Sequence, residues 1–127
     1  MSTEANKAII RRLVEEVLNQ GKLDVIDELF APNFVDRSTG EQVPGPEGVR
    51  QFVSAVRAGF PDLLVSVDDL IAEGDKVVIR TTWQGTHQGI YAGKAPTGRQ
   101  ARRTMIQIFR LANGTFVEEW NEGAGLA

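Results

Sequence analysis

The chain has no cysteine among its 127 residues, and its one histidine is His87. Without thiols there is no disulfide, no thiolate nucleophile and no cysteine-ligated zinc or iron–sulfur centre. A single imidazole is also too few for a metal site built on several histidines. We therefore expect no metal site in this chain.

Positive charge is also in short supply. Lysine and arginine number 14 against 17 aspartates and glutamates, so the formal net charge is −3. A field of this sign repels nucleic acid and anionic lipid. No stretch approaches the roughly 18 consecutive apolar residues of a membrane span, and the start, "MSTEANK", lacks the features of a signal peptide. We expect a cytoplasmic protein with no nucleic-acid partner and no membrane partner.

What the sequence does contain fits a single domain over residues 1–127, beginning with helices. In three stretches the apolar residues recur at intervals of three and four, which is typical of a helix with one buried face. Serine or threonine at the start and glycine or proline at the end supply the expected boundaries. The expected helices run from Ser2 or Thr3 to Gly21, from Leu23 to Phe30, and from Pro46 to Pro61.

From Leu63 onward the apolar period changes to two, which indicates strands. Turn sequences such as "EGD" and "ANG" separate the runs. Helices followed by strands predict an α+β fold in which the helices pack on one face of an antiparallel sheet. The expected strands cover residues 63–72, 76–87, 101–111 and 115–122.

The last hairpin decides which side chains face the helices, because a shift of one residue sends every side chain to the opposite face. A two-residue turn, "NG", would pair Ile106 with Asn121. A three-residue loop, "ANG", would pair Met105 with Asn121 and Gln107 with Glu119. We expect the three-residue loop.

In that register both faces of the hairpin mix apolar and polar residues. The face toward the helices collects Met105, Gln107, Phe109, Val117, Glu119 and Asn121. Its polar members need partners, so we expect them to line a cavity or a wet cleft. The other face collects Ile106, Ile108, Arg110, Phe116, Glu118 and Trp120. An apolar second face needs cover, so we predict a homodimer through Ile106, Ile108, Phe116 and Trp120.

The strand over 76–87 alternates in the same way. Its better core side carries Val77, Ile79, Thr81, Trp83 and His87. We therefore expect Trp83 to be a wall of the same interior and His87 to lie near its mouth. An imidazole titrates near neutral pH, which suits acid–base work, but a histidine at a strand end is as often hydrogen-bonded to a loop carbonyl.

Several stretches resemble the SnoaL-like polyketide cyclases, a branch of the nuclear-transport-factor-two-like fold that also holds ketosteroid isomerase. They are "NKAIIRRLVEEVLNQGKLDVIDELFAPNFVD", "GPEGVRQFVSAVRAGFPDL", "GTHQGIYAGKAPTGR" and "IFRLANGTFVEEWN", which together span nearly the whole chain. The resemblance implies a cone of about three N-terminal helices closed over a curved, mixed, mainly antiparallel sheet. It also implies a largely apolar pocket and dimers formed through the outer sheet face.

For chemistry, the resemblance implies intramolecular aldol closure of a polyketide ester without metal or cofactor. The cyclases hold an acid–base aspartate directly after the tryptophan of the last strand, where this chain has Asn121. An amide does not exchange a proton near neutral pH. Asp36 lies about where ketosteroid isomerase has its general base, and Gln107 lies where that enzyme keeps a protonated aspartic acid. Glu119 is a further carboxyl on the face of Asn121.

The leading interpretation is a cofactor-independent enzyme that abstracts a proton from a small, mainly apolar carbonyl compound. Asp36 or His87 would be the base, with Gln107 and Asn121 as hydrogen-bond donors. Met105 and Glu119 would contact the ligand, and Trp83 and Phe109 would be walls. Asp36 is alternatively a loop residue paired to Arg37. A non-catalytic binding module and an epoxide hydrolase-like enzyme remain as other functions.

Overall fold

The structure is a computed structural model that describes residues 2–38, 43–123 and 125–126. Short helices come first, one strand and a long helix follow, and four strands complete the chain. The helical elements are α1 (Thr3–Arg12), η1 (Leu13–Leu18), η2 (Leu23–Val25), α2 (Ile26–Leu29) and α3 (Gly45–Gly59). The strands are β1 (Phe30–Asp36), β2 (Leu64–Glu73), β3 (Lys76–Thr86), β4 (Gln100–Ala112) and β5 (Thr115–Glu122).

The three predicted helices are confirmed, with local differences in winding. Ser2 caps α1 by accepting a hydrogen bond from the Ala5 N–H at 3.1 Å. The first helix then continues through η1, which has π-helical geometry, and ends before Gly21, whose φ of +70° suits glycine. The second begins as the 3₁₀ turn η2 and continues as α2.

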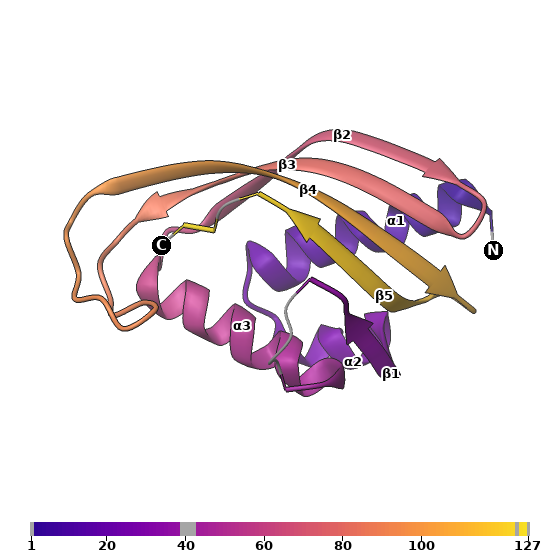
Figure 1. The fold of residues 1–127 in the computed structure, drawn as a ribbon, viewed down its shortest axis with the longest axis horizontal. Coiled ribbons are helices and arrows are strands. Elements are labelled where there is room, and N and C mark those ends of the chain that lie inside the picture. Colours follow the sequence, from indigo (N-terminus) through magenta and orange to yellow (C-terminus); the bar gives the residue numbers. More distant parts are fainter. Residues whose placement is uncertain (1, 39–42, 124, 127) are drawn as a thin grey trace.

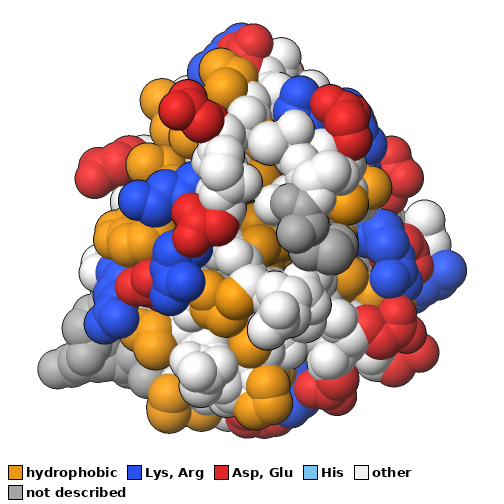
Figure 2. Space-filling view, turned by 90° about the vertical axis from the view of Figure 1, so that its right-hand side faces the viewer, with side chains coloured by type: hydrophobic (Ala, Val, Ile, Leu, Met, Phe, Trp, Pro, Cys, Tyr) orange, Lys and Arg blue, Asp and Glu red, His pale blue; other side chains and the backbone are white. Residues whose placement is uncertain are grey.

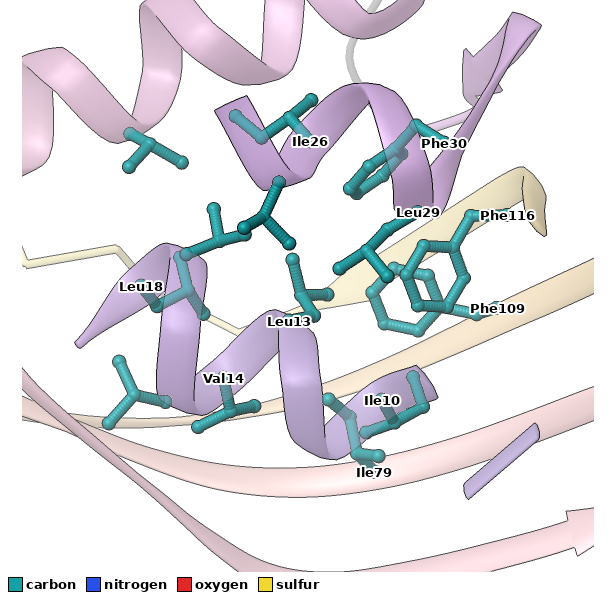
Figure 3. Close-up of a cluster of buried hydrophobic side chains, with 14 of the residues drawn as sticks. Ile10, Leu13, Val14, Leu18, Ile26, Leu29, Phe30, Ile79, Phe109 and Phe116 are labelled. Carbon is teal, nitrogen blue, oxygen red and sulfur yellow. The ribbon is translucent and has the colours of Figure 1, made fainter. Parts of the chain in front are cut away.

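The five strands form one mixed sheet in the order β1-β5-β4-β3-β2. β1 pairs with β5 in parallel, and the other neighbours pair antiparallel. The sheet arches over the helices, which cover its inner face (Figure 1). Between the two layers lies a core of buried apolar side chains that includes Ile10, Leu13, Ile79 and Phe109 (Figure 3). The predicted α+β fold on a curved, mixed, mainly antiparallel sheet is confirmed.

The sequence pattern did not predict β1. Pro32 lies within this strand, and we took it as the stop of the preceding helix. Proline lacks the N–H that a central strand needs, but β1 is at the edge of the sheet, where only one side is paired. The strand gives the sheet its parallel pair, and its end places Asp36 opposite Glu119.

The β4–β5 hairpin has neither of the two predicted registers. It turns through two residues, Asn113 and Gly114, at φ of 52° and 80°, so Ala112 pairs with Thr115. One extra residue, Val117, then bulges out of the ladder. The prediction of a three-residue loop was wrong. Beyond the bulge the register places Gln107 opposite Asn121 and Phe109 opposite Glu119.

The bulge changes which residues near the turn point inward. Phe116 was expected on the outer face, but it is fully buried, and its ring lies 4.9 Å from that of Phe30 and 4.7 Å from that of Phe109 between ring centroids. Its assignment to a dimer interface was wrong. Because Val117 absorbs one step of the alternation, Gln107, Phe109, Glu119 and Asn121 still share the predicted inner face.

On the outer face, Ile106 is 47 % exposed, and Ile108 and Trp120 are partly exposed. Ion pairs lie beside them: Arg80 contacts Asp69 at 2.7 Å, and Arg37 contacts Glu118 at 2.9 Å. Figure 2 shows one end of the molecule, where acidic and basic side chains alternate with small groups of hydrophobic ones.

Candidate functional site

A cavity of about 490 Å³ lies between the helices and the inner face of the sheet. Most of its wall is apolar. The helical side supplies residues from η1 and α3, and the sheet side supplies aromatic and aliphatic residues (Figure 3). The apolar lining includes Leu13, Val14, Leu18, Phe30, Phe34, Val49, Phe52, Val53, Ile79, Trp83, Met105 and Phe109. This lining suits an apolar ligand body.

One end of the cavity is polar, and three strands build it. β5 presents Glu119 and Asn121 two residues apart on its inner side, β4 presents Gln107 opposite Asn121, and β1 ends with Asp36 opposite Glu119. Ser38 follows just beyond β1 and also lines the cavity. Residues distant in the sequence therefore meet at β5, which pairs in parallel with β1 on one side and antiparallel with β4 on the other.

A chain of hydrogen bonds links these side chains. Gln107 Nε2 donates to Asn121 Oδ1 at 2.7 Å and to Glu119 Oε2 at 3.2 Å. Asn121 Nδ2 donates to Asp36 Oδ2 at 3.2 Å, and the backbone N–H of Ser38 donates to Asp36 Oδ1 at 2.9 Å. The backbone N–H of Asn121 donates to Ser38 Oγ. Both amide side chains thus have fixed orientations between two carboxyl groups.

Glu119 is the most perturbed carboxyl group of the site. Burial in the cavity wall and, to a smaller extent, the negative charge of Asp36 together raise its pKa to about 8, against the opposing effect of the amides of Asn121 and Gln107. Glu119 is therefore largely protonated at neutral pH. A protonated carboxyl group can donate a hydrogen bond and can also transfer its proton. An amide can donate a hydrogen bond but does not transfer a proton near neutral pH.

The cavity brings together seven of the eight predicted site residues. Asp36, Asn121, Glu119, Gln107, Met105, Phe109 and Trp83 all line it. The Trp83 indole N–H donates to Thr81 Oγ1 at 2.9 Å, so this side chain presents its aromatic surface rather than a free donor.

His87 is the exception, and its predicted place at the cavity mouth was wrong. β3 ends at Thr86, so the alternation cannot be extended to His87. Its ring instead stacks on Phe60, with centroids 5.3 Å apart, and Nδ1 lies 3.3 Å from Thr97 Oγ1. The ring is 8 % exposed and does not line the cavity.

The alternative in which Asp36 pairs with Arg37 is not what the structure shows. The Arg37 guanidinium contacts Glu118, at 2.9 Å between Nε and Oε2. The same Glu118 carboxylate also accepts a hydrogen bond from Arg110 Nε. Asp36 turns to the other side, toward Asn121. Its charge therefore acts on the cavity.

Some lining residues were not singled out from the sequence. Ser38 is the polar one, and it follows Asp36 by two residues, so a predicted strand ending at Asp36 would have indicated it. Phe34 and Val35 lie on the same unrecognised strand. Pro44, Gly45 and Gly48 come from the start of α3 and the segment before it. The absence of β1 from the prediction thus accounts for Phe34, Val35 and Ser38, but not for the residues near the start of α3.

Two further findings concern the described residues as a set. Across residues 2–38, 43–123 and 125–126, no cluster of three or more histidine, cysteine, aspartate or glutamate side chains is arranged to hold a metal ion. Within the same ranges, no helix has the length and apolar character needed to cross a membrane.

Helices packed on a curved, mixed five-stranded sheet, with a cavity between the layers, define the nuclear-transport-factor-two-like class. Within it, the model of the SnoaL-like polyketide cyclase family matches residues 8–123. The chain belongs to this family. It is 31 % identical over 110 residues to aklanonic acid methyl ester cyclase AcmA from Streptomyces galilaeus, an overlap of 84 % of this chain and 76 % of that protein.

Solved structures share this fold. TsrD from Streptomyces laurentii has a TM-score of 0.90 at 26 % identity, over 97 % of this chain and 90 % of that one. AclR from Streptomyces galilaeus has a TM-score of 0.85 at 29 % identity, over 97 % of this chain and 77 % of that one. A SnoaL-like polyketide cyclase from Agrobacterium tumefaciens, 18 % identical, shows the same fold with a TM-score of 0.81 over 100 % of this chain and 95 % of that one.

Proposed function

We propose that this chain is a cofactor-independent enzyme that removes a proton alpha to a carbonyl group in a small, mainly apolar, polyketide-ester-like compound. The observation that carries the proposal is a carboxyl group with a pKa of about 8, Glu119, at the polar end of an otherwise apolar cavity, beside a second carboxyl group, Asp36. Two carboxyl groups in different protonation states supply an acid and a base at one pH.

The two groups divide the work as follows. Asp36 acts on Glu119 as a negative charge, so it is the base that accepts the proton when the C–H bond breaks. The electron pair moves to the carbonyl oxygen, and the protonated Glu119 donates a hydrogen bond to the enolate that forms. In an aldol closure the enolate carbon bonds to a second carbonyl carbon, and Glu119 gives its proton to the new alkoxide. The proton on Asp36 then restores the starting state of the pair.

The two amides have different roles in this arrangement. Gln107 Nε2 directs its hydrogens to Glu119 and Asn121, so Gln107 holds the acid in place. Asn121 Nδ2 gives one hydrogen to Asp36 and has a second to offer to a substrate oxygen. The substrate carbonyl would lie at this end, with the apolar body among η1 and α3.

Hydrogen–deuterium exchange alpha to the carbonyl tests the proposal, measured by NMR on a panel of polyketide-like esters and cyclic ketones. Glu119→Gln and Asp36→Asn should each slow the exchange by roughly 10²- to 10⁴-fold. His87→Ala is the matched control, because His87 is ionisable but lies outside the cavity lining, and it should exchange as the wild type does. Exchange that is unaffected by both carboxyl substitutions would refute the proposed roles.

A non-catalytic binding module is the second candidate, and Asn121 favours it, because the family position for the acid–base aspartate holds an amide here. Saturable binding of panel compounds, detected by thermal shift, together with no exchange above background would support the module. An epoxide hydrolase-like site gains no support, because it requires an arginine between two carboxylates and the described lining residues include no arginine.

The assembly proposed for the enzyme is a homodimer through the outer sheet face, with Ile106, Ile108 and Trp120 at its centre. The 47 % exposure of Ile106 on a sheet face supports it. Sedimentation velocity checks it: the wild type should sediment as a dimer, and Trp120→Glu should shift it toward the monomer. A wild type that stays monomeric at high concentration would refute this assembly.

A further inference from the structure

The end of β1 carries Asp36, yet its attachment to the sheet is short. β1 is an edge strand, and its pairing with β5 is interrupted between Phe30 and Val35. Beyond this irregularity, Val35 and Asp36 pair with β5, and the Arg37 N–H donates to the Glu119 carbonyl at 2.8 Å. Edge strands with few ladder bonds open readily, so the position of Asp36 needs further support.

Side chains on the outer side supply that support. Glu118 accepts from Arg37 at Oε2, at 2.9 Å, and from Arg110 at Oε1. Its side chain is only 17 % exposed, and the guanidinium groups of Arg110 and Arg37 lower the pKa of its carboxyl group. Charge-assisted hydrogen bonds to both carboxylate oxygens restrict all three side chains. The cluster thus joins β1, β5 and β4 directly behind the polar end of the cavity.

The ion pair between Arg37 and Glu118 also determines on which face of the sheet the positive charge of Arg37 lies. Arg37 adjoins Asp36 in the sequence, and a guanidinium beside that carboxylate would neutralise the charge that helps keep Glu119 protonated. Because Glu118 holds Arg37 on the outer side, Asp36 keeps its charge toward the cavity. Among the described lining residues, the side chains with ionisable acidic or basic groups are Asp36 and Glu119.

We propose that Arg37 and Glu118 are positioning residues whose ion pair fixes the end of β1 so that Asp36 faces Asn121 and Glu119. Neither residue is among the described residues that line the cavity, so the pair acts through Asp36. This inference rests on the proposed function for its catalytic meaning, whereas its structural content is measurable without a substrate.

Arg37→Gln tests the inference, because loss of the Arg37 charge alone and loosening of the end of β1 would shift the pKa of Glu119 in opposite directions. Removing a nearby positive charge, with no change in structure, would raise the pKa of Glu119. Loosening the end of β1 would move the Asp36 charge away and admit water, so the pKa would fall. We expect it to fall from about 8 toward about 7. The Glu119 carboxyl carbon is followed by NMR titration of ¹³C-glutamate-labelled protein, and its resonance is assigned by its absence in Glu119→Gln.

Arg80→Gln is the matched control, because Arg80 pairs with Asp69 at 2.7 Å between β3 and β2, away from β1. It should leave the Glu119 pKa unchanged. Arg37→Lys, which retains the charge, should restore part of the wild-type value. Hydrogen exchange of the backbone amide at position 37 gives an independent measurement and should accelerate in Arg37→Gln and in Glu118→Gln, but not in Arg80→Gln.

An unchanged or raised Glu119 pKa in Arg37→Gln, with unchanged protection of the backbone amide at position 37, would overturn the inference. This failure is distinct from failure of the proposed function. If the wild type exchanges no panel compound, the enzyme proposal falls while the titration still decides the positioning role. If the wild type is active, Arg37→Gln should also shift the pH profile of exchange in the same direction as the pKa.

Discussion

Glu118 and Glu119 are neighbours on β5 with the same side chain, and the two faces of the strand shift their pKa values in opposite directions. Two guanidinium groups lower the pKa of Glu118, whereas burial and the charge of Asp36 raise that of Glu119 to about 8. Their electrostatic partners also come from the same two places, strand β4 and the end of β1 with the residue that follows it. The alternation of a strand is therefore enough to give adjacent identical residues opposite protonation states at neutral pH.

The difference shows what separates a structural carboxylate from a chemical one in this fold. Glu118 meets compensating charge and holds strands together. Glu119 meets amides and a like charge, and its pKa lies near working pH, where proton transfer in both directions is efficient. The inner face of β5 thus carries the carboxyl group suited to proton transfer, while the outer face carries the carboxylate that links neighbouring strands.

The largest effect is expected from a test of which residues the bulge places on the inner face and which on the outer face. Phe116→Ala should reduce the free energy of unfolding by roughly 3–5 kcal/mol, because Phe116 is fully buried among aromatic rings. Ile71→Ala, also on the exposed outer face but not among the three residues assigned to the dimer contact, should cost about 0.5 kcal/mol. Urea denaturation of both variants measures the difference, and similar losses would contradict the placement of Phe116.

The pH dependence of stability sharpens the comparison on the inner face. The folded-state pKa of Glu119, about 8, lies above the ordinary glutamate value of 4.5, so the folded chain retains a proton that the unfolded chain releases. The stabilisation is fully present below about pH 4.5 and is lost as pH rises toward 8, at up to about 1.4 kcal/mol per pH unit. Glu119→Gln should flatten this slope in denaturant titrations, and an unchanged slope would contradict the assignment.

The smallest effect on the pH dependence of stability is expected for Glu118 on the outer face, where the dependence has the opposite sign to that of Glu119. The folded-state pKa of Glu118 is lowered, so its contribution to stability is present above the ordinary glutamate value of 4.5 and is lost as pH falls through the folded-state value. Glu118→Gln should therefore weaken the acid-side loss of stability. Glu122→Gln, an exposed carboxyl group on the same strand, is the control. Equal acid-side curves for the two variants would show that the contacts of Glu118 do not persist in solution.

Periodic segments were predictable from the sequence because burial imposes their pattern. The three helices and four strands followed from apolar spacing, and most of the cavity residues followed from alternation along β3, β4 and β5. The register of the last hairpin was predicted wrongly, yet Gln107, Glu119 and Asn121 were assigned to the correct face. Both an added loop residue and a bulge preserve that face, and only coordinates distinguish them.

The misplaced elements depended on information that is not periodic. Pro32 was interpreted as the end of a helix. A proline is tolerated in a strand that has a neighbouring strand on one side only, and the local sequence does not show which strands lie at the edge of the sheet. His87 was placed by extending an alternation one step past the end of β3. The high pKa of Glu119 arises first from burial that no local pattern shows, and second from Asp36, 83 residues earlier. Long-range pairing of β1 with β5 accounts for much of what the sequence left open.

The bulge at Val117 has a consequence for how the length of this strand can vary. A chain one residue shorter at that position would form a regular ladder, and both Glu119 and Trp120 would keep their sides. The same deletion two residues further on would remove Glu119 itself and, with the bulge kept, would bring Trp120 into its place, so that the indole would lie among the helices. Loss of a residue thus preserves the two faces at the bulge and abolishes the site just beyond it.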